Sequence, residues 1–177
     1  MKIPGLPRPE HLPVLLFQSS HERDCDMEKV FFEDYETGET LVSPGRTITE
    51  TDIVMFAGIT GDWHPIHTNV EYAAKTMFGE RIAHGMLGLT IGSALVFRLG
   101  PYVFTPKKFI AFYGMDKIRF TAPIKIGDTI RCEATVAEMK ERDEHTGTIA
   151  YDGRIKNQRD EDCVIFTPKI LVGRKTD

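Results

Sequence analysis

Apolar and polar residues alternate along most of the second half of the chain. Between residues 129 and 140, apolar side chains occupy every second position up to residue 136, and charged or polar ones lie between them. The apolar ones are Ile130, Cys132, Ala134 and Val136. A period of two is typical of a β-strand with one buried and one exposed face. Similar stretches predict strands at residues 109–120, 148–157 and 163–172, and the turn residues between them predict an antiparallel meander.

The first half of the chain carries helix signals. Thr49 can close a capping box with Asp52 ahead of an apolar run, and Gly61 follows as a stop. A second short helix is predicted over residues 70–77. A single strand over residues 39–46 precedes both helices.

Residues 85–99 are apolar on all sides, with Arg98 as their only charge. This pattern predicts a helix that is buried all round, and the stretch is too short to span a bilayer. It also contains small residues that lower helix stability but let another backbone approach closely. These are Gly88, Gly92, Ser93 and Ala94. One strand, then helices, then several strands predict an α+β fold with a sheet wrapped around this helix.

The chain has 177 residues, which fits one domain. We expect residues 1–28, with four prolines, to form an extended N-terminal arm, and residues 29–177 to form the domain. The net charge of -4 argues against a nucleic-acid partner. Cys25, Cys132 and Cys163 are widely spaced and suggest neither disulfides nor a thiolate metal site. With no export signal or membrane span visible, we predict a cytoplasmic protein.

The most unusual segment is the loop between the two predicted helices, residues 60–67, which contains Asp62 and His67. A carboxylate and an imidazole across a Pro-containing loop could converge on one water molecule as a general acid/base pair. The alternative is that Asp62 only caps a turn and that His67 is a hydrogen-bonded loop histidine.

A second candidate feature is the start of the buried helix at His84 and Gly85. The first N–H groups of a helix have no intrahelical partner and carry the positive end of the helix dipole, so they can bind a developing oxyanion. An acid/base pair beside such a site suits chemistry next to a carbonyl group. The alternative is a purely structural role, in which Gly85 only allows the chain to enter the helix where space is tight.

Two segments of the chain closely resemble the hydratase motif of the MaoC-like dehydratase family, which includes the (R)-specific enoyl-CoA hydratases. They run from Phe56 to His67 and from Ile82 to Leu87, with Ala73 and Phe78-Gly79 between them. The resemblance runs from about residue 31 to 172. It implies a hot-dog fold, in which an antiparallel sheet curls around one long helix. It also implies a homodimer or higher homo-oligomer acting on acyl-CoA thioesters, and we predict no cofactor.

The resemblance assigns roles to individual residues. Asp62 and His67 would bind and activate the catalytic water, and the backbone N–H of Gly85 would hold the thioester oxygen. Ser93, on the central helix, would support the site. We count His64 and His84 with Gly85 and Ser93 as candidate substrate-binding residues.

One residue departs from the hydratase pattern, because His64 stands where the enoyl-CoA hydratases usually carry Asn. His replaces the amide only in part, so the acyl group stays open. His64, His67 and His84 with Asp62 could instead hold a divalent cation, although no zinc spacing matches and we predict no metal. Two rival functions also remain: a hot-dog thioesterase and a catalytically silent acyl-CoA-binding subunit.

Overall fold

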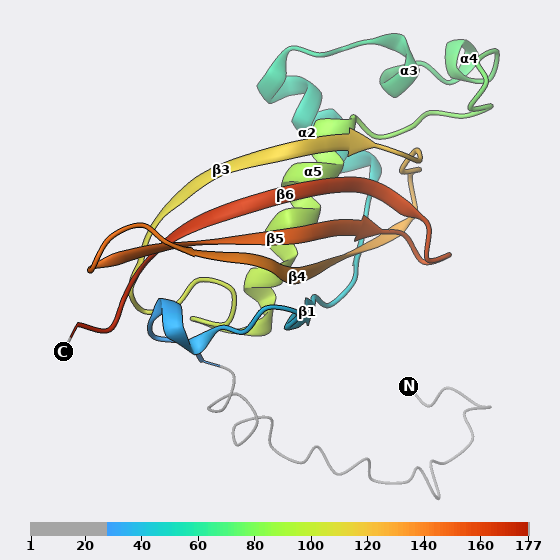
Figure 1. Ribbon diagram of the computed structural model, residues 1–177. Coiled ribbons are helices and arrows are strands. Elements are labelled where there is room, and N and C mark those ends of the chain that lie inside the picture. Colours follow the sequence, from blue (N-terminus) through green and yellow to red (C-terminus); the bar gives the residue numbers. More distant parts are fainter. Residues whose placement is uncertain (1–27, 177) are drawn as a thin grey trace, which may run out of the picture.

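The computed structural model describes residues 28–176, so most of the predicted N-terminal arm, including Cys25, lies outside the described residues. The four predicted strands are confirmed to within a few residues. They are β3 (Phe109–Phe120), β4 (Thr129–Glu141), β5 (Thr146–Lys156) and β6 (Asp162–Gly173). All neighbours pair antiparallel in the order β1-β4-β5-β6-β3 (Figure 1).

The strand predicted over residues 39–46 is interrupted and forms two short strands, β1 (Thr40–Val42) and β2 (Arg46–Thr47), which both pair with β4. Pro44 lies between them and has no N–H for the ladder. Ser43 bridges the break, because its N–H donates to the Cys132 carbonyl at 2.8 Å and its hydroxyl accepts from the Cys132 N–H at 2.8 Å.

The first helix, α2 (Glu50–Thr60), begins at the predicted capping box, in which the Thr49 hydroxyl accepts from the Asp52 N–H. It ends at Gly61, whose φ of 77° is left-handed. The second helix is shorter than predicted: α4 covers only Val70–Ala73, followed by turns up to Gly79. The loop before it contains one further helical turn, α3 (Pro65–Thr68), which starts at a proline. A short 3-10 turn, η1 (Phe32–Asp34), precedes the sheet.

The predicted central helix is confirmed as α5 (Gly85–Ala94), which continues into the 3-10 turn η2 (Leu95–Leu99). The antiparallel sheet wraps around α5, as Figure 1 shows, so the predicted hot-dog arrangement is observed. A Cβ added to Gly88 would lie 2.5 Å from Ile124 Cδ1, and one added to Gly92 would lie 2.5 Å from Ile155 Cδ1. Gly92 therefore permits the close approach of α5 to β5, and Gly88 permits the close approach of α5 to the segment between β3 and β4.

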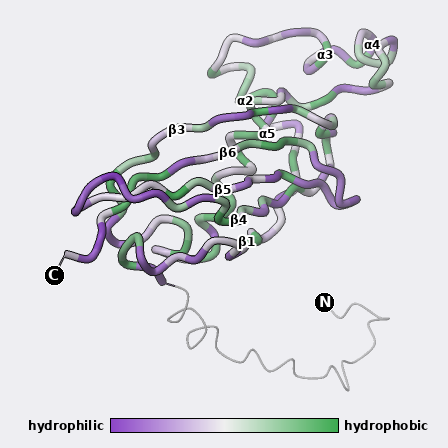
Figure 2. Tube along the Cα trace, viewed as in Figure 1, coloured by the Kyte–Doolittle hydropathy of each residue, from purple (hydrophilic) through white to green (hydrophobic). Residues whose placement is uncertain are grey.

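The core lies between α5 and the sheet. Figure 2 shows hydrophobic residues along α5 and alternating colours along the strands β4 to β6. The inward positions of β4 are all almost completely buried, namely Ile130, Cys132, Ala134 and Val136. The helices α2, α3 and α4 lie together beyond β3 at one end of the molecule, next to the start of α5 (Figure 1). Within residues 28–176 no helix is long and apolar enough to cross a bilayer.

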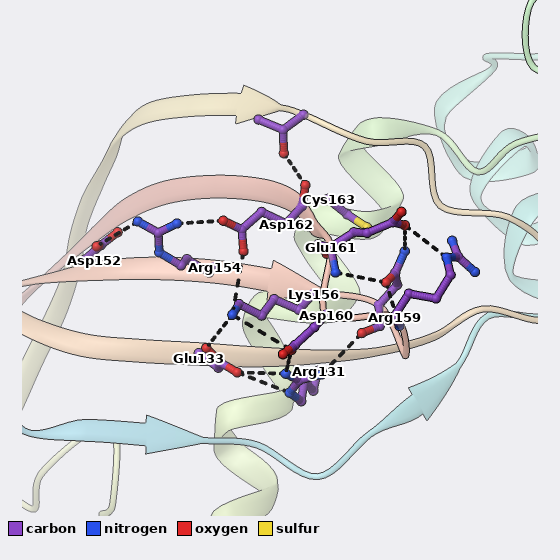
Figure 3. A network of polar contacts seen from close by, with 12 residues as sticks. Arg131, Glu133, Asp152, Arg154, Lys156, Arg159, Asp160, Glu161, Asp162 and Cys163 are labelled. Atoms are coloured by element: carbon purple, nitrogen blue, oxygen red, sulfur yellow. Dashed lines mark hydrogen bonds and ion pairs between the residues drawn. The ribbon is translucent and has the colours of Figure 1, made fainter.

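Charged side chains of β4, β5, the β5–β6 turn and the first residue of β6 form a continuous network (Figure 3). Its members are Arg131, Glu133, Asp152, Arg154, Lys156, Asp160 and Asp162. Exposed ion pairs add little stability individually. The network reaches the start of β6 at Asp162, whose backbone carbonyl accepts from the Thr121 hydroxyl and which Cys163 follows.

A second polar cluster centres on Asp128, which is buried at the turn before β4. Its carboxylate accepts from the Lys125 N–H at 2.8 Å, from Gln158 Nε2 at 2.6 Å and from the Arg159 guanidinium at 3.2 Å. Burial acts to raise the pKa of Asp128, but these hydrogen bonds hold the pKa below its ordinary value. The stabilisation is therefore present above the ordinary Asp pKa and is lost as pH falls through the lower folded-state pKa.

We expect Asp128→Ala to lower the free energy of unfolding by about 1–3 kcal/mol, because it removes a buried carboxylate that accepts three hydrogen bonds. Urea unfolding at neutral pH measures this. Asp128→Asn keeps one amide oxygen as an acceptor and should lose less. An alanine variant with the wild-type urea midpoint would contradict the prediction.

Candidate active site

Four of the six predicted site residues meet at a cavity of about 630 Å³ between the end of α2, the loop that follows it, the start of α5 and the adjoining ends of β3 and β6. Asp62, His67 and His84 supply its carboxylate and imidazole side chains, and Gly85 lies beside them. Most of the remaining wall is apolar. These apolar residues include Phe56, Phe78, Ile82, Met86, Phe120, Ile124 and Val164. Polar groups that converge at one end of an apolar cavity are typical of a small-molecule site.

Asp62 is held by the tight turn that ends α2. Its N–H donates to the Thr60 hydroxyl at 3.3 Å, and its Oδ1 accepts from the His64 N–H at 3.2 Å. The second carboxylate oxygen makes no hydrogen bond within the described part of the chain. This oxygen is therefore available to accept a hydrogen bond from water.

His67 is oriented by the backbone. Its Nδ1 lies 2.7 Å from the Ile82 carbonyl oxygen. Because a carbonyl only accepts, Nδ1 carries the ring proton and Nε2 keeps a free lone pair. Burial is the largest cause that lowers the pKa of His67, and the hydrogen bond to Ile82 opposes this shift. His84 and His64 lower the pKa further, whereas the Asp62 carboxylate raises it. The balance favours the neutral base at neutral pH.

Gly85 begins α5, and the preceding His84 offers no side-chain cap to the first N–H groups. The ring of Phe120 covers Gly85 so closely that an added Cβ would lie 2.8 Å from its Cδ1. Gly85 is therefore a tight fit at the entry to α5 and also lines the cavity, so both alternatives from the sequence stay open.

Two of the predicted substrate-binding residues do not line the cavity. Ser93 lies further along α5, and its hydroxyl donates to the Thr90 carbonyl at 3.4 Å. His64 caps α3, where its Nδ1 accepts from the Ile66 N–H at 3.2 Å. His64 thus takes over the acceptor half of an asparagine at this position.

Three of the four possible metal ligands come together. Asp62, His67 and His84 each have a donor atom within 4.8 Å of the others, whereas His64 is outside this group. A ring nitrogen of each of these two histidines already contacts a backbone carbonyl: His67 Nδ1 contacts Ile82, and His84 Nε2 contacts Asp62. The arrangement therefore suits either a hydrogen-bonded water molecule or a bound cation.

Several cavity residues could not be found from the sequence, among them four where β3 ends and β6 begins. Phe120 and Thr121 lie at the end of β3, and Cys163 and Val164 lie at the start of β6. Their local pattern is that of ordinary strand residues, and only the pairing of β3 with β6 brings them to the cavity. Burial raises the pKa of the Cys163 thiol to about 11, so it stays protonated at neutral pH.

A family model described as a MaoC like domain matches residues 33–157, well over half of the chain. The chain belongs to this family. The resemblance inferred from the loop and the helix start is therefore confirmed, and so is the hot-dog fold that it implied.

Relatives of this MaoC-like chain include enzymes. An (R)-specific enoyl-CoA hydratase from Rhodospirillum rubrum is 42% identical over 109 residues, covering 62% of this chain and 71% of that protein. Protein MaoC from Klebsiella aerogenes is 39% identical over 105 residues, covering 59% of this chain but only 30% of that protein. A solved Archaeoglobus structure, described as a monoamine oxidase regulatory protein, superposes with a TM-score of 0.77 at 38% identity and covers 84% of this chain and 97% of that one.

Proposed function

We propose that this protein is a hydratase or dehydratase that adds water to, or removes it from, an enoyl-CoA thioester. The observation that carries the proposal is the convergence of Asp62, His67 and the Gly85 end of α5 on one largely apolar cavity. The expected class, a carbon-oxygen lyase, is supported by the (R)-specific enoyl-CoA hydratase among its relatives. An apolar cavity also suits an acyl chain.

In the proposed hydration, the free carboxylate oxygen of Asp62 and the Nε2 of His67 hold one water molecule. The water oxygen forms a bond to the β-carbon, and the proton that it loses is delivered to the α-carbon, so water is added across the double bond. The N–H of Gly85 donates to the thioester oxygen as negative charge develops there. The reverse sequence removes water. We assign His64 and Ser93 supporting roles outside the cavity.

The direct test is to mix the purified protein with crotonyl-CoA, then with longer and branched enoyl-CoAs, and to follow the absorbance of the conjugated thioester. Loss of this absorbance without release of free thiol supports hydration. Release of free CoA from saturated acyl-CoA would favour the thioesterase. Binding of acyl-CoA with no absorbance change on any substrate would favour the silent subunit.

The pH dependence follows from His67. Because burial lowers its pKa, the neutral base persists to below about pH 6.5, the ordinary value for histidine. We expect kcat/KM for hydration to be level around neutral pH and to fall tenfold per pH unit on the acid side, with the midpoint below 6.5. A pH-rate profile of the free enzyme measures this. A midpoint clearly above 6.5 would contradict the assignment.

We further propose a homodimer that forms through β3, whose only strand partner within residues 28–176 is β6. Ile110, Phe112 and Tyr113 on this edge strand are each about half exposed, and an open edge with apolar side chains is a template for pairing with a second copy. Light scattering should give twice the 20.0 kDa of one chain, and Phe112→Lys with Ile110→Lys should shift the mass towards one chain. A monomeric wild type at micromolar concentration would refute this proposal.

Cytoplasmic localisation is also part of the proposal. Within the described range both cysteines, Cys132 and Cys163, are free and buried. Free thiols suit a reducing compartment.

A further inference from the structure

His84 contacts the backbone of Asp62 and the ring of His67, and it is only 3% exposed. Its Nε2 is 2.9 Å from the backbone carbonyl oxygen of Asp62. Since the carbonyl only accepts, Nε2 is the donor in this contact. The hydrogen bond ties the start of α5 to the loop that carries Asp62, across 22 residues of sequence.

The face of the same ring packs against His67. The two ring centroids are 3.8 Å apart, and the ring planes differ by 27°. Phe56 also contacts the His84 ring, with centroids 5.0 Å apart. With the Ile82 hydrogen bond holding one edge of His67 and His84 covering a face, rotation that would move Nε2 away from the water is hindered.

The other nitrogen of His84, Nδ1, is buried and has no hydrogen-bond partner among the described residues. A buried polar atom without a partner costs free energy, so packing alone does not favour histidine over phenylalanine at this position. The other ring nitrogen, Nε2, donates its hydrogen bond to the backbone carbonyl of Asp62.

We propose that His84 is a positioning residue for the reaction proposed above: its Nε2–H holds the Asp62 peptide and its ring face holds His67, so that both catalytic groups reach one water molecule. This replaces the direct substrate-binding role expected from the sequence. The expected effect on kcat rests on the proposed function. The two contacts of His84 can be tested without measuring turnover.

Two variants separate the two contacts. His84→Phe keeps a flat ring against His67 but removes the donor to Asp62, whereas His84→Gln keeps a donor but removes the ring. We expect each to lower kcat by about 10²-fold, since small misplacements of catalytic groups have effects of this size, while KM for crotonyl-CoA changes less than threefold. His145→Gln, at an exposed histidine on the β4–β5 turn, is the matched control and should keep the wild-type kcat.

A double-mutant cycle distinguishes positioning from packing. If His84 acts through Asp62, then His84→Phe should cost far less in an Asp62→Asn background than in the wild type. Loss of kcat that adds in full to the loss from Asp62→Asn would overturn the proposal. A kcat within twofold of the wild-type value in both His84 variants would also overturn the proposal, whether or not the urea midpoint of these variants falls.

The histidine titration provides a reading that needs no turnover. The ionisable groups that face His67 are His84 before α5, Asp62 in the loop and His64 before α3. From β6, the buried Cys163 thiol stays neutral. Removing the neighbouring imidazole in His84→Phe should move the NMR titration of His67 to higher pH, and the acid limb of the pH-rate profile should move with it.

The hydrogen bond to Asp62 has its own signal, because its carbonyl shares a peptide group with the Trp63 N–H. His84→Phe should shift the Trp63 amide resonance, and His84→Gln should shift it less. If the wild type hydrates no enoyl thioester, the proposed function fails, yet these two NMR readings still decide the role of His84. An unchanged Trp63 amide together with an unchanged His67 titration would overturn it.

Discussion

Replacement of Asp62 by Asn is expected to lower kcat for hydration of crotonyl-CoA by about 10²–10⁴-fold, the usual contribution of a positioned acid or base. The amide keeps an oxygen that can accept from the His64 N–H, as Oδ1 does at 3.2 Å in the wild type. It loses the negative charge and the free carboxylate oxygen that would hold the water. The absorbance assay measures the loss.

The comparison needs a matched control. Asp152→Asn makes the same chemical change at an exposed carboxylate that pairs with Arg154 on β5, away from the cavity. It should leave kcat unchanged. A folded Asp62→Asn protein with wild-type turnover would exclude Asp62 from the chemistry and return it to the role of a turn cap.

Removing the backbone N–H of Gly85 should lower kcat by about 10²–10³-fold, as loss of one oxyanion donor does in other enzymes. Gly85→Pro removes this N–H and is compatible with the first position of a helix. The preceding residue, His84, already has ψ near 136°, which suits a residue before proline. The obstacle is Phe120, whose ring leaves no room for a side chain at residue 85.

Two substitutions at residue 85, Gly85→Ala and Gly85→Pro, are therefore made in a Phe120→Ala background, which relieves the clash. Gly85→Ala and Gly85→Pro in that background then differ mainly in the N–H group. A loss of kcat confined to the proline variant supports the oxyanion role. Equal activity of the two would mean that Gly85 is only a tight entry to α5.

The site is assembled from segments that are held in place in two ways, by local hydrogen bonds and by contacts with residues far away in the sequence. The loop of Asp62 is ordered by local hydrogen bonds within a few residues of it. His67 needs the carbonyl of Ile82, 15 residues away, and His84 joins the loop to α5. Local sequence can specify the first kind of contact but not the second.

Local sequence did predict the elements with strong short-range signals. The alternation in residues 129–136 follows directly from one buried face, and the capping box of Thr49 and Asp52 marks the start of α2. The signals failed where pairing or packing competed with them. Pro44 divided the first strand, and α4 stopped at Ala73.

From its sequence alone, this chain could be placed in its family, because the loop residues and the helix start form contiguous motifs that resemble those of MaoC-like proteins, and that resemblance implies the hot-dog fold. Tertiary structure alone decided that Phe120 and Val164 wall the cavity, that Ser93 lies outside it and that His84 binds the Asp62 peptide. The reason is that strand pairing and ring packing join residues far apart in the chain, and no local pattern records which partners meet.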